Sequence, residues 1–516
     1  MTGRIEDPDL LRGIRPFLAD IACPGALHAG FVRSPVAHGR VVSIDAEAAL
    51  ARPGVVAVHD AESLPLPPFR LFGDLPDGLN HLPLDPLVRH VGAPIAVVLG
   101  SSPEAVADAI DLIDVEIEGL RPIPTPDLDA PPLYPAQANN LVHRIDDSDR
   151  SDPLGGIETE TIVELSIRNQ RIASAPIECD GILATPETDG RLDVWCTSQG
   201  VQSMRNQLAQ LLGLDVDRMR VRSAAVGGGF GGRASAIPEF VVVIALAREL
   251  GRPIRWVQDR YENLTGMAQG RGYESMMRVG LDANLAMTGL DVDLVADAGS
   301  SAHVAGLLMV SVRRQATGLY RVPALRWSGS CVLSTTTPVG AYRGAGQPEA
   351  NHARERLLDA TARRVGVDPI EFRRHNLATA DEFPLPTLGG VTYDRADPHA
   401  ALDMALDRVG LDHWRTEQAG RRSRADHVEI GIGIANYAQS SGRGTPVDAA
   451  QVEVRADGSV VISCASPTHG QGHLTTWAGL VADRLGIDPN RVVLIDADTD
   501  AMARGQSTGG SRSSQV

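Results

Sequence analysis

The sequence predicts an α+β protein of several domains, and three observations support this fold class. The chain has 516 residues, which is too long for one core because domains usually contain roughly 100–200 residues. Residues 94–117 show strand, helix and strand patterns in succession. Segments 212–221 and 485–494 share Leu, Gly, Asp and Arg at equal offsets. We therefore expect an N-terminal α/β unit followed by a duplicated α+β region.

The N-terminal unit is predicted as a compact α/β domain over residues 1–121. An apolar strand is expected at 94–99, and a second strand at 115–117. Between them, Ser102 has the side chain of a helix N-cap and Pro103 suits the first helical position. After residue 121 the composition shifts to Pro, Asp, Asn and Ser. We expect residues 122–153 to be a connector that crosses the surface.

The repeated segments predict two related halves, at 154–394 and 395–516. In each repeat a glycine ends a helix, an aspartate turns the chain and alternating apolar residues begin a strand. A glycine-rich loop follows each strand, at 227–232 and at 505–514. Duplicated halves that face each other enclose ligands between equivalent loops. The two loops are therefore expected to line one pocket.

Three glycine-rich segments, at 226–233, 341–346 and 469–473, are interpreted as walls of one cofactor pocket. Glycine lets the backbone approach a bulky ligand, while Arg343 and Gln471 supply oriented donors to anionic or oxo ligands. Gln471 precedes a predicted helix N-terminus, a location that suits an anion. An alternative for Arg343 is a surface arginine paired with a carboxylate. Gly344 and Gly346 beside it favour the pocket.

Residues 227–232 also match the G-x-G-x-x-G pattern of nicotinamide dehydrogenases. The acidic residue expected about 20 positions later, on the next strand, is absent there. The stretch 233–237 also separates the glycines from the helix that would hold the pyrophosphate. An NAD-dependent dehydrogenase that uses 227–232 therefore remains the alternative function.

Composition excludes several function classes. A net charge of −17 argues against nucleic acid as a partner. The chain contains no lysine, which excludes Schiff-base chemistry and the P-loop lysine. No apolar run approaches the ~20 residues of a membrane span, and no secretory signal is recognisable, so a cytoplasmic protein is expected.

Metal ligation by side chains is also not expected. The five cysteines show no C-x-x-C spacing, so an iron–sulfur relay would lie in another subunit. His469 and His473 are four residues apart, but Gly470 and Gly472 break the helix that a zinc pair of this spacing needs.

Segments along nearly the whole chain resemble the molybdenum-binding large subunit of the xanthine dehydrogenase and aldehyde oxidase family, the molybdenum hydroxylases. The segments that carry this resemblance are 27–38, 91–97, 169–171, 176–178, 197–199, 226–233, 341–346, 470–472 and 510–514. The resemblance implies a hammerhead-like N-terminal domain, followed by a molybdopterin-binding region in two halves.

The resemblance implies a molybdopterin-type cofactor, in its cytosine dinucleotide form, whose dithiolene holds the metal without side-chain ligands. The cofactor-binding residues that it implies are Gln199, Gly229, Phe230, Gly231, Arg343, Gly470, Gln471, Gly472, His473, Gly510, Ser511, Arg512, Ser513 and Ser514. Arg343 is the implied catalytic residue, because it would neutralise charge that develops on substrate or oxygen.

The implied reaction is hydroxylation of an electron-poor C–H with oxygen from water, assisted by a glutamate base. Electrons would pass to an iron–sulfur small subunit and an FAD-binding medium subunit. In the family the glutamate lies in a Gly-x-Gly-Glu segment beyond the position of Ser514, whereas this sequence stops at Val516. The second half is therefore expected to be incomplete and the chain inactive alone, with a separate chain as one source of the remainder. A non-catalytic relative is a further alternative.

Three substitutions bear on the substrate that the resemblance implies. Ala234 and Ala345 stand where purine-oxidising members have glutamate and phenylalanine. Gly344 stands where copper-type carbon monoxide dehydrogenases have cysteine. An aldehyde or an N-heteroaromatic compound is therefore the expected substrate.

Overall fold

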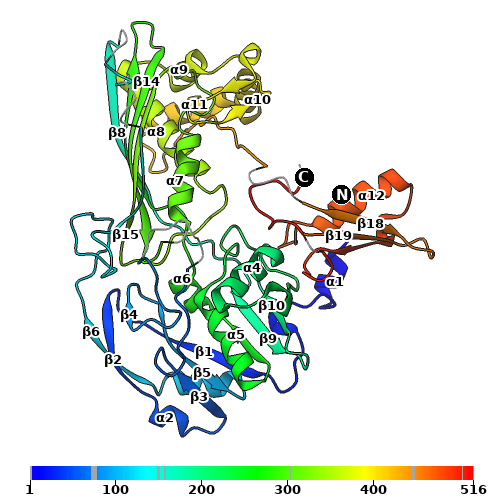
Figure 1. Cartoon of the computed structure of the whole chain (residues 1–516). Coiled ribbons are helices and arrows are strands. Elements are labelled where there is room, and N and C mark those ends of the chain that lie inside the picture. Colours follow the sequence, from blue (N-terminus) through cyan, green and yellow to red (C-terminus); the bar gives the residue numbers. More distant parts are fainter. Residues whose placement is uncertain are drawn as a thin grey trace.

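The structure is a computed structural model that describes residues 3–70, 78–147, 152–155, 159–302, 304–442, 448–502 and 504–514. Figure 1 shows a lower body around a seven-stranded sheet, an upper body around a five-stranded sheet and a smaller unit, coloured orange to red, beside them. None of the described helices combines the length and hydrophobicity required of a membrane-spanning segment.

The lower body is built on a sheet with the strand order β11-β10-β9-β12-β1-β5-β3. Its strands are β1 (Leu27–Arg33), β3 (Val55–His59), β5 (Pro94–Gly100), β9 (Gly181–Pro186), β10 (Leu192–Cys196), β11 (Met219–Arg222) and β12 (Ile254–Val257). Helix α3 (Pro103–Ile110) packs on β1 and β5, whereas α4 (Val201–Leu212) packs on β11 and α5 (Pro238–Leu250) on β9 and β12. The Ser102 cap is confirmed, because its side chain accepts a hydrogen bond from the Ala105 N–H at 3.2 Å.

The N-terminal residues predicted as a compact unit over 1–121 contribute to two sheets, one of their own and one that they share with later residues. β1 pairs in parallel with β12, so Leu27 lies opposite Ile254 and the N-terminal strands extend the sheet of the cofactor region. The remaining N-terminal elements are η1 (Leu18–Asp20), α2 (Glu47–Leu50) and the small sheet of β2 (Gly39–Asp45), β4 (Leu87–Val88) and β6 (Asp114–Gly119).

The upper body contains a sheet with the order β7-β15-β14-β13-β8. Its strands are β7 (Leu141–Asp146), β8 (Thr161–Asn169), β13 (Tyr273–Leu281), β14 (Met287–Gly299) and β15 (Leu325–Leu333). Helix α7 (Ala305–Arg314) packs on β14 and β15, and α8 (Gln347–Val365) packs on β8 and β13. Helix α6 (Arg260–Gly266), helix α9 (Pro369–Asn376), η3 (Ala380–Glu382) and the pair β16 (Leu385–Pro386) and β17 (Thr392–Tyr393) complete this part of the chain.

The segment 122–153, predicted as a surface connector, contains a strand and several buried side chains among its mostly exposed or half-buried described residues. β7 forms one edge of the upper sheet, and Leu133, Tyr134 and Asn140 are buried. The Asn140 side chain accepts from the Leu133 N–H at 2.8 Å, and the Tyr134 hydroxyl donates to the Ser300 carbonyl at 2.8 Å. Polar connectors can be buried when their hydrogen bonds are satisfied internally.

Residues 395–516, predicted as the second half of the cofactor-binding region, are distributed over two parts of the structure. Helices α10 (Pro398–Val409) and α11 (Leu411–Ser423) lie beside α8 and α9, and Leu402 joins the core of the upper body (Figure 1). The smaller unit has its own core, and it contains β18 (Ala450–Val454), β19 (Val460–Cys464), α12 (His473–Leu485), η4 (Pro489–Arg491) and β20 (Val492–Ile495). Helix α1 (Asp7–Leu11) lies next to this unit (Figure 1).

The predicted repeat is confirmed as local structure. Helices α4 and α12 both end at a left-handed glycine, Gly213 with φ 63° and Gly486 with φ 68°. In each copy an aspartate then caps a short 3-10 turn: the Asp215 side chain accepts from the Asp217 N–H, and the Asp488 side chain accepts from the Asn490 N–H. Strands β11 and β20 follow directly.

The two copies meet where these strands end. The Val221 N–H donates to the Thr499 hydroxyl at 3.0 Å, and the Thr499 N–H donates to the Val221 carbonyl at 3.1 Å. The guanidinium of Arg220 also pairs with Asp498. The loops that follow β11 and β20 therefore leave this junction together.

Candidate cofactor site

A cleft of about 1690 Å³ lies where the glycine-rich loops of the lower body, the upper body and the smaller unit meet. Its walls include most of the residues that the sequence predicted to bind a cofactor. These are Gln199, Phe230, Gly231, Arg343, Gly470, Gln471, His473, Gly510, Ser511, Arg512, Ser513 and Ser514. The structure thus brings together segments that are far apart in sequence, such as those of Gln199 and Thr508, which are 309 residues apart.

Gly229 and Gly472 do not line the cleft. A Cβ atom at Gly229 would lie 2.8 Å from the Gln199 side chain, and one at Gly472 would lie 3.3 Å from Glu6 Oε1. Both glycines are buried, and Gly472 also has φ 78°, so they support the cleft wall from behind, and their contact with a cofactor stays a prediction.

Gln199 joins two of the loops. Its Oε1 accepts from the N–H groups of Gly231 at 2.8 Å and Arg233 at 3.2 Å, and its Nε2 donates to the Thr508 carbonyl at 3.0 Å. The Thr508 N–H returns a bond to the Gln199 carbonyl at 2.7 Å. Since an amide nitrogen carries two hydrogens, one Nε2 hydrogen is left for a ligand, while the amide oxygen is already used by the protein.

Each of three cleft loops contains one non-glycine residue with positive φ. These residues are Phe230 at 54°, Ala345 at 47° and Ser511 at 54°. Residues held in sparsely populated backbone regions concentrate at ligand sites, where the surrounding structure maintains them. The Arg343 N–H donates to the Phe230 carbonyl at 2.8 Å and so ties the first loop to the second. Phe230 is 41% exposed although it is large and apolar, so its ring is available to a ligand.

Arg343 presents a guanidinium group to the cleft. Its side chain is exposed, and no hydrogen bond or ion pair reaches it from the part of the chain that the structure describes. Its backbone is fixed instead, because Arg271 donates to the Arg343 carbonyl at 2.9 Å and pairs with Glu349 at 3.1 Å. The alternative of a carboxylate-paired surface arginine is not what the described residues show.

The loop before α12 presents Gln471 while His473 is held by the protein. Gln471 Oε1 accepts from the His469 N–H at 2.8 Å, which leaves the Nε2 group of this exposed side chain for a ligand. The buried His473 places its Nδ1 atom 3.1 Å from the Ser466 carbonyl and its ring 4.2 Å from that of Trp477. Burial lowers the pKa of His473 and lowers that of His469 to about 4. Both rings are therefore neutral near neutral pH.

The last described loop is held by Arg512. This buried side chain donates to the Ser507 carbonyl at 2.9 Å and lies 3.4 Å from Asp448. Gln439 Nε2 lies 2.6 Å from the Ser511 hydroxyl. Arg512 therefore holds the loop in shape. Ser513 and Ser514 lie on the cleft wall, and within the described ranges their hydroxyl groups form no hydrogen bond.

Three of the amides in the loop at 227–232 are already bonded within the protein. The Gly227 N–H donates to Glu178, the Gly231 and Arg233 N–H groups donate to Gln199, and the Gly232 N–H donates to the Gly229 carbonyl. A dinucleotide turn needs such N–H groups to face the phosphates. These bonds argue against the NAD alternative.

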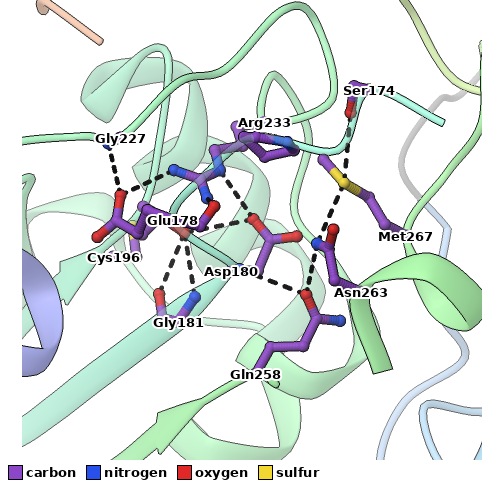
Figure 2. Close-up of polar contacts among 12 residues, drawn as sticks. Ser174, Glu178, Asp180, Gly181, Cys196, Gly227, Arg233, Gln258, Asn263 and Met267 are labelled. Atoms are coloured by element: carbon purple, nitrogen blue, oxygen red, sulfur yellow. Dashed lines mark hydrogen bonds and ion pairs between the residues drawn. The ribbon is translucent and has the colours of Figure 1, made fainter. Parts of the chain in front are cut away.

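A buried charge cluster lies directly behind this loop, and Figure 2 shows Arg233 between Glu178 and Asp180. Arg233 donates to Glu178 Oε2 at 3.0 Å and to the Glu178 carbonyl, and its Nε lies 3.2 Å from Asp180 Oδ1. Burial raises the pKa of Asp180, and the positive charge of Arg233 opposes that rise. The sequence analysis included Glu178 in the resemblance but gave it no role.

The N-terminal segment is the part of the site that sequence reasoning missed. Arg4 donates to the Gly470 carbonyl at 3.0 Å, the Ile5 N–H donates to Thr475 at 2.9 Å, and the Ala225 N–H donates to the Pro16 carbonyl at 3.0 Å. The segment thus crosses the cleft from α12 to the loop after β11. No local pattern in the sequence signals contacts across more than 460 residues.

Asp496 is a buried carboxylic acid in the cleft wall, directly after β20. It accepts from the Thr468 N–H at 2.7 Å, and its exposed fraction is 7%. Burial raises its pKa to about 6, although the Thr468 bond and the nearby positive charge of Arg15 act in the opposite direction. The sequence analysis did not select this residue.

Comparison with known proteins identifies the family. The family model for the aldehyde oxidase and xanthine dehydrogenase a/b hammerhead domain matches residues 12–121, and models for the molybdopterin cofactor-binding domain match 133–377 and 404–516. The carbon monoxide dehydrogenase large chain of Hydrogenophaga pseudoflava is 30% identical over 99% of this chain and 68% of its own length. The chain belongs to the molybdenum hydroxylase family. The resemblance stated from the sequence is confirmed, and so is the α+β fold with a hammerhead domain before molybdopterin-binding domains.

Other molybdenum hydroxylases match with similar coverage. The nicotine 6-hydroxylase large subunit of Paenarthrobacter nicotinovorans is 31% identical over 99% of this chain and 65% of its own length. The crystal structure of quinoline 2-oxidoreductase from Pseudomonas putida 86 superposes with a TM-score of 0.89 at 30% identity, covering 98% of this chain and 67% of that one. The chain therefore spans about two thirds of the length of these relatives.

Proposed function

We propose that the cleft binds a molybdopterin-type molybdenum cofactor, and that the chain is the cofactor-binding part of a hydroxylase for an aldehyde or an N-heteroaromatic compound. The convergence of three strained glycine-rich loops on one cleft, with the unpaired guanidinium of Arg343 in its wall, carries this proposal. The matches to two molybdopterin cofactor-binding domains support the class of cofactor.

The donor set and the size of the cleft fit such a cofactor. Ligand pockets usually enclose about 300–1,000 Å³, and a cleft of about 1690 Å³ accommodates a larger group. Arg343, the Gln471 amide and the hydroxyls of Ser513 and Ser514 supply donors for oxo and phosphate oxygens. A Cβ atom at Gly509 would meet nothing within 4 Å, so the loop that carries these serines leaves open space. The cytosine dinucleotide form is our proposal for the nucleotide part.

The protein contributes binding and electrostatics to the reaction. When bound, the cofactor would supply two-electron oxidation and oxygen that comes from water. Arg343 would hold the negative charge that develops on the substrate or its oxygen, and it is free to do so because no carboxylate within the described ranges neutralises it. The exposed Phe230 ring offers a flat apolar surface to an aromatic substrate.

The loop at 341–346 bears on the choice of substrate. Gly344 has φ 98°, and a Cβ atom there would overlap the Pro348 ring, so the structure leaves no room for the cysteine of a copper site. Carbon monoxide is therefore disfavoured even though a carbon monoxide dehydrogenase is among the relatives. The names of two relatives, nicotine 6-hydroxylase and quinoline 2-oxidoreductase, support a nitrogen heterocycle as substrate.

We further propose that electrons leave through an iron–sulfur small subunit and an FAD-binding medium subunit. The five cysteines of this chain are all free and scattered, and none of the described His, Cys, Asp and Glu residues forms a group suited to a metal ion. The activity of the chain should therefore be tested in a complex with these subunits.

The test is to purify the chain after co-expression with the genes of its candidate partner subunits and to analyse the bound groups. We expect molybdenum together with a pterin, and CMP released on acid hydrolysis, with Arg343→Ala retaining the same molybdenum content. Purified complex that contains bound NAD and no molybdenum would refute the proposal in favour of the dehydrogenase.

A further inference from the structure

We propose that Glu178 is the positioning residue that holds the loop at 226–233 in the conformation that presents Phe230 and Gly231 to the cleft. The significance of this conformation for a cofactor rests on the proposed function. The positioning itself rests on contacts that the structure shows.

The Glu178 carboxylate connects three segments of the chain. Its Oε2 accepts from the Gly227 N–H at 2.7 Å, where the loop begins, and from Arg233 at 3.0 Å, where the loop ends. Its Oε1 accepts from the Leu18 N–H at 3.4 Å, in the N-terminal segment that crosses the cleft. One side chain therefore fixes both ends of the loop.

The loop needs such support because its backbone is strained. Phe230 has φ 54°, and it lies between positions with φ 104° at Gly228 and 100° at Gly231. Conformations of this kind cost of order 1–3 kcal/mol for a non-glycine residue and persist only where the surroundings impose them. Arg343 holds Phe230, and Gln199 holds Gly231 and the backbone of Arg233, which leaves the beginning of the loop at Gly227 to Glu178.

The charges around Arg233 make it possible to test the positioning role of Glu178 without unfolding the protein. The Arg233 side chain is completely buried and faces two carboxylates, those of Glu178 and Asp180 (Figure 2). In a Glu178→Gln variant Arg233 still faces Asp180, so a buried ion pair remains. Loss of both partners would leave an uncompensated buried charge, which is the strongly destabilising case. Glu178→Gln is therefore expected to fold.

Asp180→Asn is the matched control. It removes one carboxylate from the same arginine and changes the charge by the same amount. Within the described residues the Asp180 carboxylate contacts the Arg233 side chain and accepts from the Thr197 hydroxyl at 3.3 Å, and it accepts from no backbone N–H group of the loop. A structural role shared by the whole cluster would affect both variants equally, whereas a positioning role is specific to Glu178.

The experiment measures amide hydrogen exchange in the peptide that spans 226–234, in the purified complex. A hydrogen bond from the backbone to a charged group typically protects an amide by about tenfold to a hundredfold. We expect exchange at Gly227 to be faster by that factor in Glu178→Gln and unchanged in Asp180→Asn. Equal exchange in the two variants, or no change in Glu178→Gln, would overturn the proposal.

A further variant, Glu178→Asp, and the molybdenum content of all variants provide two additional tests. If Glu178→Gln does not fold, Glu178→Asp keeps the charge but shortens the side chain by one methylene, and it is expected to show the same faster exchange. Wild-type exchange in Glu178→Asp would again overturn the proposal. Molybdenum content per chain is expected to fall in the Glu178 variants and to stay constant in Asp180→Asn. Because exchange is measured on the protein itself, it tests the positioning even if the cofactor assignment fails.

Discussion

The buried carboxyl group of Asp496 gives a quantitative prediction for the pH dependence of folding. Its pKa lies at about 6 against an ordinary value of 3.8, a difference of about 2 units. At 1.36 kcal/mol per unit this corresponds to about 3 kcal/mol. The folded state binds the proton more tightly than the unfolded state, so the protonated acid is favoured in the fold. Stability is therefore lost as the pH rises from about 4 to about 6, and above that range the loss is complete.

The Asp496→Asn variant removes this titration while keeping the shape of the side chain. The amide oxygen can still accept from the Thr468 N–H, which now donates to the carboxylate at 2.7 Å. Relative to wild type, we expect the variant to gain about 3 kcal/mol of unfolding free energy between pH 4 and pH 7. Other titrating groups cancel in this comparison because they are the same in both proteins.

The assay is urea unfolding followed by circular dichroism at pH 4, 5, 6 and 7, with Asp483→Asn as the control. Asp483 is exposed on α12 of the same unit, so its replacement is expected to change stability by the same small amount at every pH. A difference between wild type and Asp496→Asn that does not depend on pH would refute the reasoning. A wild type that gains stability relative to the variant as the pH rises would refute even its sign.

Two further predictions concern the cleft loops. Replacement of Arg343 by alanine should lower turnover about 10²–10³-fold, as expected for loss of an electrostatic stabiliser, with unchanged molybdenum content; loss of metal at constant activity per metal would contradict this. Gly231→Ala is expected to lower the unfolding free energy by clearly more than Gly213→Ala, for which about 1 kcal/mol is expected. A Cβ atom at 231 would lie 2.8 Å from the Ala341 carbonyl oxygen, whereas a Cβ atom at 213 would meet nothing within 4 Å. Equal melting temperatures for these two glycine variants would show that the loop contact does not constrain position 231.

Much of the local structure could be predicted from the sequence because it depends on neighbouring residues. The Ser102 cap, the left-handed Gly213 and Gly486 and the capped turns that follow them are set by the conformational preferences of those residue types. The glycine-rich segments were also found without a structure, because glycine marks both left-handed backbone and close approach.

Long-range contacts could not be predicted in the same way. The Pro-rich and Asn-rich segment before β7 has the composition of a surface loop, yet Tyr134 is buried, because its hydroxyl finds a partner in the distant Ser300 carbonyl. Likewise, Gln199 was expected to face a cofactor, whereas most of its hydrogen-bonding capacity connects two loops. The type of a residue determines which hydrogen bonds its side chain can form, whereas the fold determines which partner it meets.

This distinction also indicates how the cleft would select its ligand. The backbone amides at 227, 231 and 233 are bonded to Glu178 and Gln199, so these three donors are not available to a ligand, whereas the Phe230 ring of the same loop is exposed. Further donors come from the second Nε2 hydrogen of Gln199 in the lower body, and from Arg343, Gln471 and the serines at 513 and 514 in the other two bodies. Recognition of an anionic ligand therefore requires all three bodies to be in place. The junction between Val221 and Thr499, where the repeated strands end, joins two of them directly through hydrogen bonds.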